Sequence, residues 1–198
     1  MKYDFDEIIP RRHTNSLKYD CAEKFGKPDG LLPMWVADMD FQTPPAVREA
    51  LAAKAAHGIF GYSDPDETYY EALAHWFGTR HNWLVDPHTS VTAPGVVFAI
   101  CTLIRALTKP GDAVLIQEPV YYCFREGIRD NGRRTIVNEL RFDGEHYSID
   151  FEDFERKIVE NDVKLFILCS PHNPVGRVWT KEELEKLAEI CLRHGVFV

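Results

Sequence analysis

Apolar and polar positions follow two different patterns along this chain, and the change falls near residue 90. From there on, continuous apolar runs alternate with segments whose apolar residues recur every three or four positions. The runs indicate strands, most clearly at 163–169, which is continuous and apolar as in strands buried on both faces, and the periodic segments indicate amphipathic helices. The expected strands are 90–95, 113–117, 134–140, 163–169 and 196–198, and the expected helices begin near residues 95, 119, 151 and 181.

Regular alternation of strand and helix predicts an α/β fold with a parallel-rich sheet and helices on both faces. Thr180 and Glu183 have the spacing of a capping box, and Gly195 is expected to end that helix. The last residues, VFV, begin a further strand with no helix after it. We therefore expect the chain to be the front part of a longer domain.

The chain before residue 90 has a less regular pattern. Residues 1–42 mix charged residues, glycines and prolines and are expected to be irregular. A helix is expected to follow, with Thr43 as its cap, Pro44 in its first turn and Gly58 at its end.

A second helix is expected after the sequence GYSDPDETYY. Asp64 and Glu67 have capping-box spacing, and Gly78 is expected to stop this helix.

Composition excludes several classes of protein. The 198 residues carry a net charge of −8, whereas general nucleic-acid binding needs a basic surface. No apolar run approaches the length of a membrane span, and the N-terminal residues lack the apolar segment of a signal peptide, so we expect a cytoplasmic protein. The five cysteines show no CxxC spacing and are expected to be reduced thiols. The eight histidines show no HExxH spacing, so no metal site is expected.

Three turns that follow or precede expected strands carry candidate binding residues. The backbone N–H groups of Gly95, Val96 and Val97 open a helix and could bind an anion, although this glycine taken alone favours a plain helix cap. Tyr121 could lie flat against a planar ligand or simply pack under a helix. Asn173 could hydrogen-bond a ligand ring or only form an Asn-Pro turn.

These three turns are expected at one edge of the sheet, beyond the carboxyl ends of the strands. Ligands of open α/β sheets bind at this edge. Together they would supply a phosphate cradle, a stacking surface and a polar amide. A flat, phosphorylated heteroaromatic molecule would fit this set.

Five motifs carry a resemblance to a known family. They are WVADMDF (35–41), GYSDP (61–65), TAPGVVFAI (92–100), EPVYY (118–122) and SPHNPVGRVWT (170–180). With them the chain resembles the fold-type I pyridoxal-phosphate enzymes of the class I/II aminotransferase family. It is most similar to the cystathionine β-lyase branch typified by MalY and PatB.

The resemblance implies pyridoxal 5′-phosphate as cofactor and a role for each turn. Gly95, Val96 and Val97 would bind its phosphate with their backbone, Tyr121 would stack on its pyridine ring, and Asn173 would hydrogen-bond the phenolic oxygen of the ring. Tyr62 would reach the phosphate bound by the other subunit of a homodimer. Ala37 would lie beside the substrate.

The resemblance also implies a division into two domains. Residues 1–45 would form an N-terminal arm and small-domain segment, and residues 46–198 would form the first part of the cofactor-binding large domain. The family's Schiff-base lysine, its aspartate near the pyridine nitrogen and its substrate-binding arginine match no position of this chain. Lys109, Lys181 and Lys186 stand in the wrong context for such a lysine. We therefore expect the 198-residue chain alone to lack β-elimination activity.

The function implied is β-elimination from cystathionine or another S-substituted cysteine, which yields a thiol, pyruvate and ammonia. An aminotransferase on the same scaffold is the nearest alternative, and a non-catalytic regulatory or relic fragment is another. Formation of pyruvate without a keto-acid acceptor separates the lyase from the aminotransferase. A nicotinamide dehydrogenase is disfavoured because the chain has no GxGxxG motif.

Three other sets of residues have open interpretations. Asp38 and Asp40 could be a carboxylate pair for acid–base chemistry or ordinary turn residues. His172 could face a substrate, but we expect a solvated turn residue. Arg177 is expected to anchor its turn rather than to meet a substrate.

Overall fold

The computed structural model describes residues 4–28 and 30–198. The chain divides into two compact units, Met1–Ala72 and Leu73–Val198. The predicted domains divide at residue 45 instead. Compact units within this chain do not test that division, which stays a prediction.

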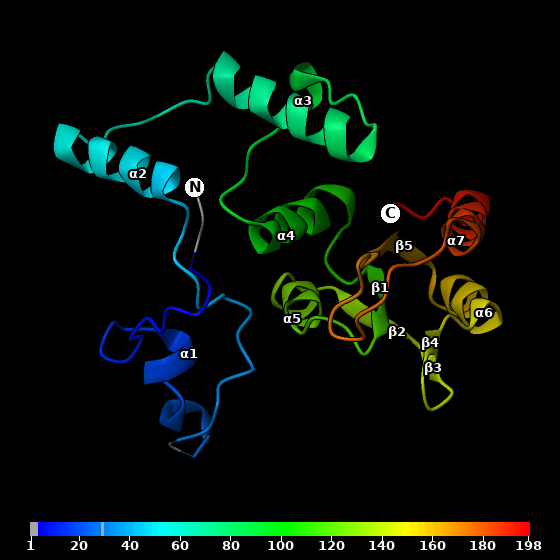
Figure 1. Cartoon of the computed structure of the whole chain (residues 1–198). Helices are drawn as coiled ribbons and strands as arrows, with labels where there is room; N and C mark the ends of the chain where they lie inside the picture. Colours follow the sequence, from blue (N-terminus) through cyan, green and yellow to red (C-terminus); the bar gives the residue numbers. More distant parts are fainter. Residues whose placement is uncertain (1–3, 29) are drawn as a thin grey trace. The chain divides into compact units, whose positions relative to one another are not determined.

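The second unit contains a three-stranded parallel sheet, as predicted (Figure 1). Its central strand is β1 (Ala113–Glu118), with β2 (Arg134–Glu139) on one side and β5 (Val163–Phe166) on the other. Residue 197 extends the sheet beyond β5, because Phe166 N donates to Phe197 O at 2.7 Å and Phe197 N donates to Lys164 O at 3.1 Å. The strand expected at residues 196–198 is thus represented by a parallel bridge at Phe197 and not by a full strand.

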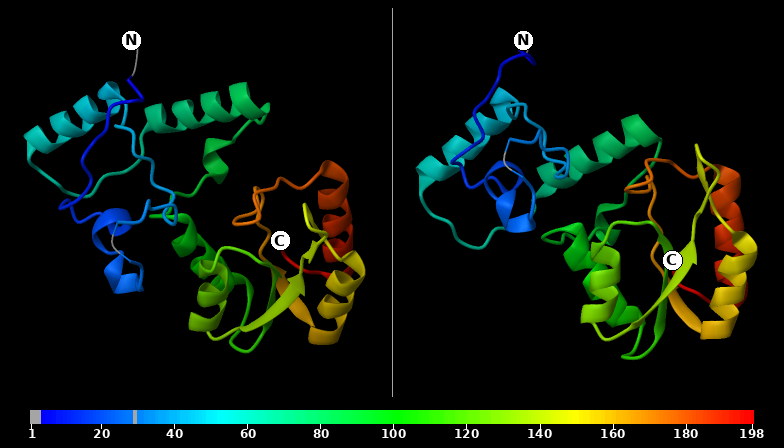
Figure 2. Two further views of the ribbon diagram at one scale, coloured as in Figure 1. Left: turned by 60° about the horizontal axis from the view of Figure 1, so that its bottom comes forward. Right: turned by 90° about the horizontal axis from the view of Figure 1, so that it is seen from below.

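Helices cover both faces of this sheet (Figure 2). α4 (Val96–Leu107) and α5 (Cys123–Asp130) pack on one face, and α6 (Phe151–Asn161) and α7 (Lys181–His194) pack on the other. Along β1, Val114 and Ile116 face the first pair of helices, while Ala113 and Leu115 face the second pair. Each face therefore buries its own apolar cluster, which explains the unbroken apolar run of β1.

An extra residue in β5 changes which faces its side chains meet. Ala113 pairs with Val163, but Val114 pairs with Leu165, so Lys164 has no partner across this pair of strands. Val163 packs on the α6 and α7 side, whereas Leu165 packs on the α4 and α5 side. A β-bulge of this kind shifts the alternation by one residue and supplies both clusters from one short strand.

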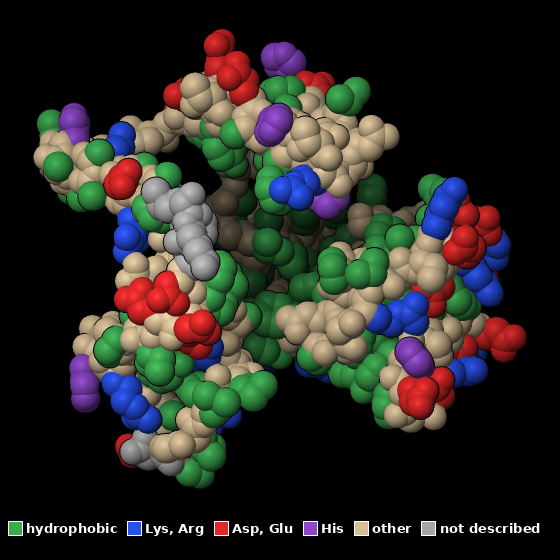
Figure 3. All heavy atoms as spheres, viewed as in Figure 1, with side chains coloured by type: hydrophobic (Ala, Val, Ile, Leu, Met, Phe, Trp, Pro, Cys, Tyr) green, Lys and Arg blue, Asp and Glu red, His purple; other side chains and the backbone are tan. Residues whose placement is uncertain are grey.

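α7 begins with the predicted capping box. Glu183 N donates to Thr180 Oγ1 at 3.2 Å, and Thr180 N donates to Glu183 Oε2 at 2.8 Å. Gly195 ends the helix with φ of 65°, a left-handed conformation that glycine adopts without strain. On the outer surface of α6 and α7, basic and acidic side chains are interspersed (Figure 3), as in the pair of Arg193 with Glu155.

The first unit is largely irregular, as predicted for residues 1–42. It contains α1 (Leu17–Asp20), the 3₁₀ helix η1 (Glu23–Phe25) and α2 (Pro45–His57), and α3 (Glu67–His81) begins in it and ends in the second unit. A further 3₁₀ helix, η2 (Pro87–Thr89), follows in the second unit. α2 ends at Gly58 with φ of 75°, as the sequence predicted.

Two expectations about helix caps are wrong. Thr43 does not cap α2, because Pro44 occupies the N-cap position and no side chain bonds to the helix start. α3 is preceded by Asp66 rather than capped by Asp64, since Asp66 Oδ1 accepts from Thr68 Oγ1 at 2.6 Å and from Tyr69 N at 3.3 Å.

Two further expectations about element bounds are wrong. α3 continues past Gly78, because one glycine costs a helix only about 1 kcal/mol. Residues 90–95 form no strand, since they pair with no strand in the described part of the chain.

One hairpin has no counterpart among the expected elements. It pairs β3 (Arg141–Phe142) with β4 (Tyr147–Ser148). In residues 4–28 and 30–198, no helix has the length and apolar character needed to cross a membrane.

Candidate functional site

Gly95 occupies a backbone conformation that only glycine adopts readily. Its φ is 152° and its ψ is 160°, in the region where an L side chain is strained. A Cβ built at this position would meet no atom within 4 Å. The glycine is therefore required by the conformation of the turn, and the space beside it is open.

The N-terminus of α4 follows this turn and has no side-chain cap. The first hydrogen bond of the helix runs from Ala99 N to Gly95 O at 3.1 Å. The N–H groups that precede Ala99 in the first turn have no partner within the helix. Val96 is 74% exposed, so the backbone here is accessible. Free N–H groups and the helix dipole make this end of α4 suitable for an anion such as a phosphate.

The start of α4 lies toward the edge of the sheet at which β1 ends. Only residues 108–112 separate the end of α4 from the start of β1, so the helix runs opposite to the strand. The helix spans about 18 Å and the strand about 20 Å, so the helix covers the whole length of the strand. Ile100 in α4 borders the same apolar cluster as Tyr121 and Cys169, which follow β1 and β5.

Tyr121 lies in the loop that follows β1, just after the cis peptide bond between Glu118 and Pro119. The ring is half-buried and meets Tyr122 and Phe124 edge-on, at centroid distances of 5.0 and 6.3 Å. The hydrogen bond with the Cys123 side chain, together with burial, raises the pKa of Tyr121 to about 12. The ring is therefore a neutral aromatic surface at physiological pH and does not act as a base.

Asn173 lies in the loop after β5, in a tightly hydrogen-bonded turn. His172 N donates to Arg177 O at 2.7 Å, and Gly176 N donates to His172 O at 2.8 Å. Asn173 N donates to Cys169 Sγ at 3.4 Å. The residue is exposed, and its amide makes no side-chain hydrogen bond to any described residue. The turn is thus fixed by its neighbours, and the amide is available to a ligand.

His172 joins the loop of Asn173 to the loop of Tyr121. Its ring nitrogen Nε2 lies 3.0 Å from Pro119 O, and because the carbonyl accepts, this nitrogen carries the proton. The expectation of a solvated residue is wrong, since His172 is 1% exposed. Burial lowers its pKa, so the ring is neutral, and its hydrogen bond to Pro119 O joins the two loops.

Trp179 supports this turn from the next segment, and neither its role nor the burial of His172 was expected from the sequence. Its ring meets the His172 ring at 5.3 Å and an interplanar angle of 87°. Trp179 Nε1 donates to Cys169 O at 2.9 Å. A tryptophan close behind the turn was the available signal that the histidine is enclosed. Arg177 anchors the turn as expected, with its guanidinium 2.6 Å from Glu183 Oε2 and 4.2 Å above the Trp179 ring.

The two candidate residues of the first unit are both exposed. Tyr62 is fully exposed, and Ala37 is exposed within the irregular segment 35–41. Asp38 and Asp40 are not a proton-transfer pair, because the Arg11 guanidinium pairs with both of them. The hydrogen bond from Arg11 lowers the pKa of Asp38. Burial opposes such a change in Asp40, but hydrogen bonds from Lys18 and Tyr19 outweigh it and lower its pKa as well.

The second unit therefore brings an uncapped helix end, an aromatic ring and an exposed amide to one edge of one sheet. A phosphate with a planar ring suits this donor set, since the helix end offers N–H donors and Tyr121 a neutral face. Within the described ranges, no group of three or more His, Cys, Asp or Glu residues is arranged to hold a metal ion.

Comparisons with known proteins find similar chains. The chain is 48% identical to cystathionine beta-lyase PatB of Bacillus subtilis over 98% of its own length and 50% of the relative. It is 38% identical to protein MalY of Escherichia coli over 99% of its own length and 50% of the relative. The structure matches the PLP-bound C-S lyase from Staphylococcus hominis with a TM-score of 0.91 and 34% identity, over 99% of this chain and 50% of that one.

The chain thus spans about half the length of the relatives it matches. The sequence profile of the family described as "Aminotransferase class I and II" matches residues 31–198. The chain belongs to the class I and II aminotransferase family.

Proposed function

We propose that the whole protein carrying this chain is a pyridoxal-phosphate-dependent carbon–sulfur β-lyase. Its substrate would be cystathionine or another S-substituted cysteine, and its products a thiol, pyruvate and ammonia. The observation that carries the proposal is the Gly95 turn, which opens the uncapped end of α4 toward the edge that holds Tyr121 and Asn173. The names of the similar proteins, a cystathionine beta-lyase and a C-S lyase, support the choice of reaction.

Each residue of the site has a proposed role. The backbone N–H groups at Gly95, Val96 and Val97 bind the cofactor phosphate, and the open space beside Gly95 admits it. The ring of Tyr121 lies along the pyridine ring. The Asn173 amide donates to the phenolic oxygen of that ring, which favours its anionic form.

When bound, pyridoxal phosphate withdraws the electrons left behind when the α-proton of an amino acid is removed. The chain described here binds and orients this group. The hydrogen bond between His172 and Pro119 fixes the distance between the loops of Tyr121 and Asn173. The pyridine ring would then be held at its face by Tyr121 and at its edge by Asn173. Fixed donors of this kind need no rearrangement during the reaction.

The first unit would contribute substrate and subunit contacts. Ala37 would bring backbone close to the substrate, and Tyr62 would reach the phosphate bound in the other subunit of a homodimer. Full exposure of Tyr62 fits a side chain that serves a neighbouring subunit. The small-molecule amino-acid substrate, the dimer and the cytoplasmic location stay proposals.

An aminotransferase is the second candidate, because the matching family carries that name. Both enzymes would use the same cofactor site and differ in the fate of the carbanion. A non-catalytic relic would retain the site without turnover.

The test is a pair of assays on the whole protein supplied with pyridoxal phosphate. Cystathionine should yield pyruvate and a free thiol with no keto acid added. Exchange of an amino group that requires a keto acid would indicate an aminotransferase. Absence of both reactions would contradict both enzymatic proposals.

The variant Asn173→Ala tests the site itself. Loss of one hydrogen bond to a charged oxygen should weaken cofactor binding about 10- to 100-fold. Asn161→Ala is the matched control, because Asn161 ends α6 just before β5 begins, at the opposite edge of the sheet. Equal cofactor affinity in the two variants would contradict the role of Asn173.

A further inference from the structure

The Arg11 guanidinium binds three consecutive residues of the segment 35–41. Its Nη1 donates to Met39 O at 3.1 Å and to Asp40 Oδ1 at 2.6 Å, and its Nη2 pairs with Asp38 Oδ2. A fourth hydrogen bond, from Nη2 to Ser16 Oγ at 3.2 Å, ties the same group back to the start of α1. One side chain therefore fixes two carboxylates and the backbone carbonyl between them.

Lys18 binds the same segment from α1. Its Nζ donates to Asp38 O at 2.9 Å and lies 3.2 Å from Asp40 Oδ2. Lys18 is 7% exposed, which is unusual for a lysine and shows that its charge is enclosed by these partners. Arg11 and Lys18 together neutralise both carboxylates and bind two successive carbonyls.

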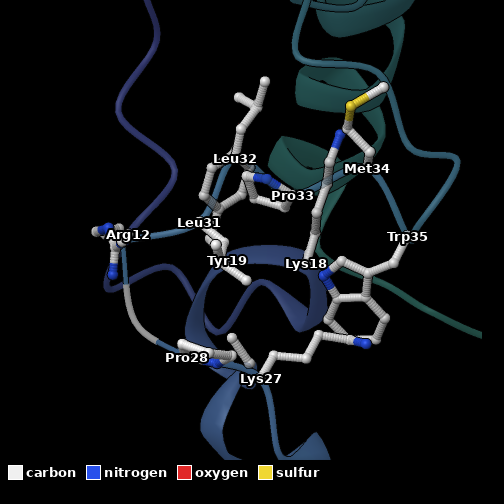
Figure 4. Close-up of a pocket in the computed structure, with 12 residues that line it drawn as sticks. Arg12, Lys18, Tyr19, Lys27, Pro28, Leu31, Leu32, Pro33, Met34 and Trp35 are labelled. Atoms are coloured by element: carbon white, nitrogen blue, oxygen red, sulfur yellow. The ribbon is translucent and has the colours of Figure 1, made fainter.

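Aromatic contacts hold the two ends of the segment. Trp35 packs against Phe25 at a centroid distance of 5.3 Å, and the Lys27 ammonium lies 5.0 Å from the Trp35 ring centroid (Figure 4). Trp35 and Lys27 line a cavity of about 320 Å³ that is lined also by Lys18. At the other end, Phe41 meets Phe5 edge-on at 5.2 Å.

Between these aromatic contacts, the backbone of the segment 35–41 forms no regular pattern of hydrogen bonds. Residues 35–41 belong to no helix or strand, so side-chain contacts set their conformation. Ala37 and Met39 are exposed, and Met39 is 75% exposed although the carbonyl of the same residue is bound by Arg11. The segment is thus held by Arg11 and Lys18 while Ala37 and Met39 stay exposed.

We propose that Arg11 is a positioning residue, which holds residues 38–40 so that Ala37 is presented to the substrate. The inference rests on the proposed function for the place of Ala37 beside the substrate. The hold on residues 38–40 comes from the contacts of this chain alone. An isolated exposed ion pair contributes little, but a guanidinium fork shared by two carboxylates and joined to a buried lysine forms a network.

The test compares Arg11→Ala, Arg11→Lys and Arg48→Ala in the whole protein. Hydrogen–deuterium exchange of the amides in residues 35–41 should be about tenfold faster in Arg11→Ala, because charge-assisted hydrogen bonds are lost. Arg11→Lys should give an intermediate rate, since a lysine holds one carboxylate but does not form a fork. Arg48→Ala should leave the rate unchanged, because Arg48 bonds Gln42 instead of the segment.

Kinetics provide the second readout. In Arg11→Ala, KM for an S-substituted cysteine should rise about tenfold, while kcat and the amount of bound pyridoxal phosphate stay within about twofold. A structural role alone would lower bound cofactor and kcat with KM unchanged, and that result would overturn the proposal. Unchanged exchange in both Arg11 variants would overturn it as well.

The outcomes separate this inference from the proposed function. If the wild-type protein shows no β-elimination, the proposed function fails, and the exchange rates still decide whether Arg11 holds the segment. If Arg11→Ala does not fold, Arg11→Lys carries the test, and an exchange rate equal to the wild type contradicts the inference.

Discussion

Different kinds of contact stabilise each of the two units of this chain internally. Every buried apolar residue in the described ranges lies in the second unit, between Ile104 and Val196. In the first unit the one buried residue that the structure describes is a cation, Lys18. Burial of apolar area stabilises the second unit, whereas ion pairs, side-chain hydrogen bonds and aromatic edges set the conformation of the first.

The difference explains where binding groups are placed. In the second unit, a packed sheet carries its polar residues in loops at one edge, so the positions of Tyr121 and Asn173 follow from the fold. In the first unit, the segment with Ala37 has no such support and depends on Arg11 and Lys18.

The largest expected effect comes from the core of the second unit. Phe154 is fully buried and meets Phe166 edge-on at 5.0 Å. Phe154→Ala should lower the free energy of unfolding by about 3–5 kcal/mol, as measured by urea denaturation of the chain. Val159→Ala on the same helix and Met34→Ala in the first unit should each change it by less than about 0.5 kcal/mol, since both side chains are mostly exposed. A comparable loss from Met34→Ala would break the comparison.

Core patterns of this strength were readable in the sequence. The apolar runs of β1 and β5 predicted the parallel sheet because both faces of these strands are buried, and β2 is only partly buried. The bulge at Lys164 was not predictable, since it depends on which residues pair across two strands. β3 and β4 escaped prediction because each has only two residues.

The candidate site was predicted only in part. Gly95, Tyr121 and Asn173 could be named from the sequence because turn residues next to strands are informative, and their roles in binding stay predictions. The burial of His172 was missed because a residue in a turn is ordinarily solvated, and its enclosure requires Trp179 and Pro119 from other segments. The Arg11 contacts join residues 27 and 29 positions apart with no periodic pattern between them.

An intermediate effect is expected at the helix starts, where the two units also differ. Thr180→Ala should lower the free energy of unfolding by about 1 kcal/mol, because it removes the capping box of α7. Thr43→Ala is the matched variant in the first unit and should have almost no effect, since Thr43 caps nothing. Urea denaturation of both variants gives the comparison, and equal losses would show that α2 is capped after all.

The smallest expected effect is a local response of the first unit to acid. Asp20 accepts from the backbone N–H groups of His13, Thr14 and Ser16 at 2.8, 3.0 and 3.0 Å. The hydrogen bond from His13 is the main cause that lowers the pKa of Asp20. A carboxyl whose folded pKa is depressed stabilises the structure above its ordinary pKa, and this contribution is lost as the pH falls through the folded value.

Below about pH 4, therefore, the loop around Asp20 should loosen while β1 stays intact. Amide chemical shifts of residues 13–16 and 113–118, followed by NMR during acidification, test this expectation. In Asp20→Asn the transition of the loop should disappear. Simultaneous loss of both sets of signals would mean that the two units do not respond separately.

The central claim is that the Gly95 turn, Tyr121 and Asn173 hold one phosphorylated pyridine, and a crystal structure of the whole protein with pyridoxal phosphate tests it most directly. The account predicts phosphate oxygens accepting from the N–H groups at the start of α4, the pyridine ring along Tyr121, and the phenolic oxygen bonded to the Asn173 amide. A phosphate bound away from α4, or a ring that touches neither Tyr121 nor Asn173, would contradict it.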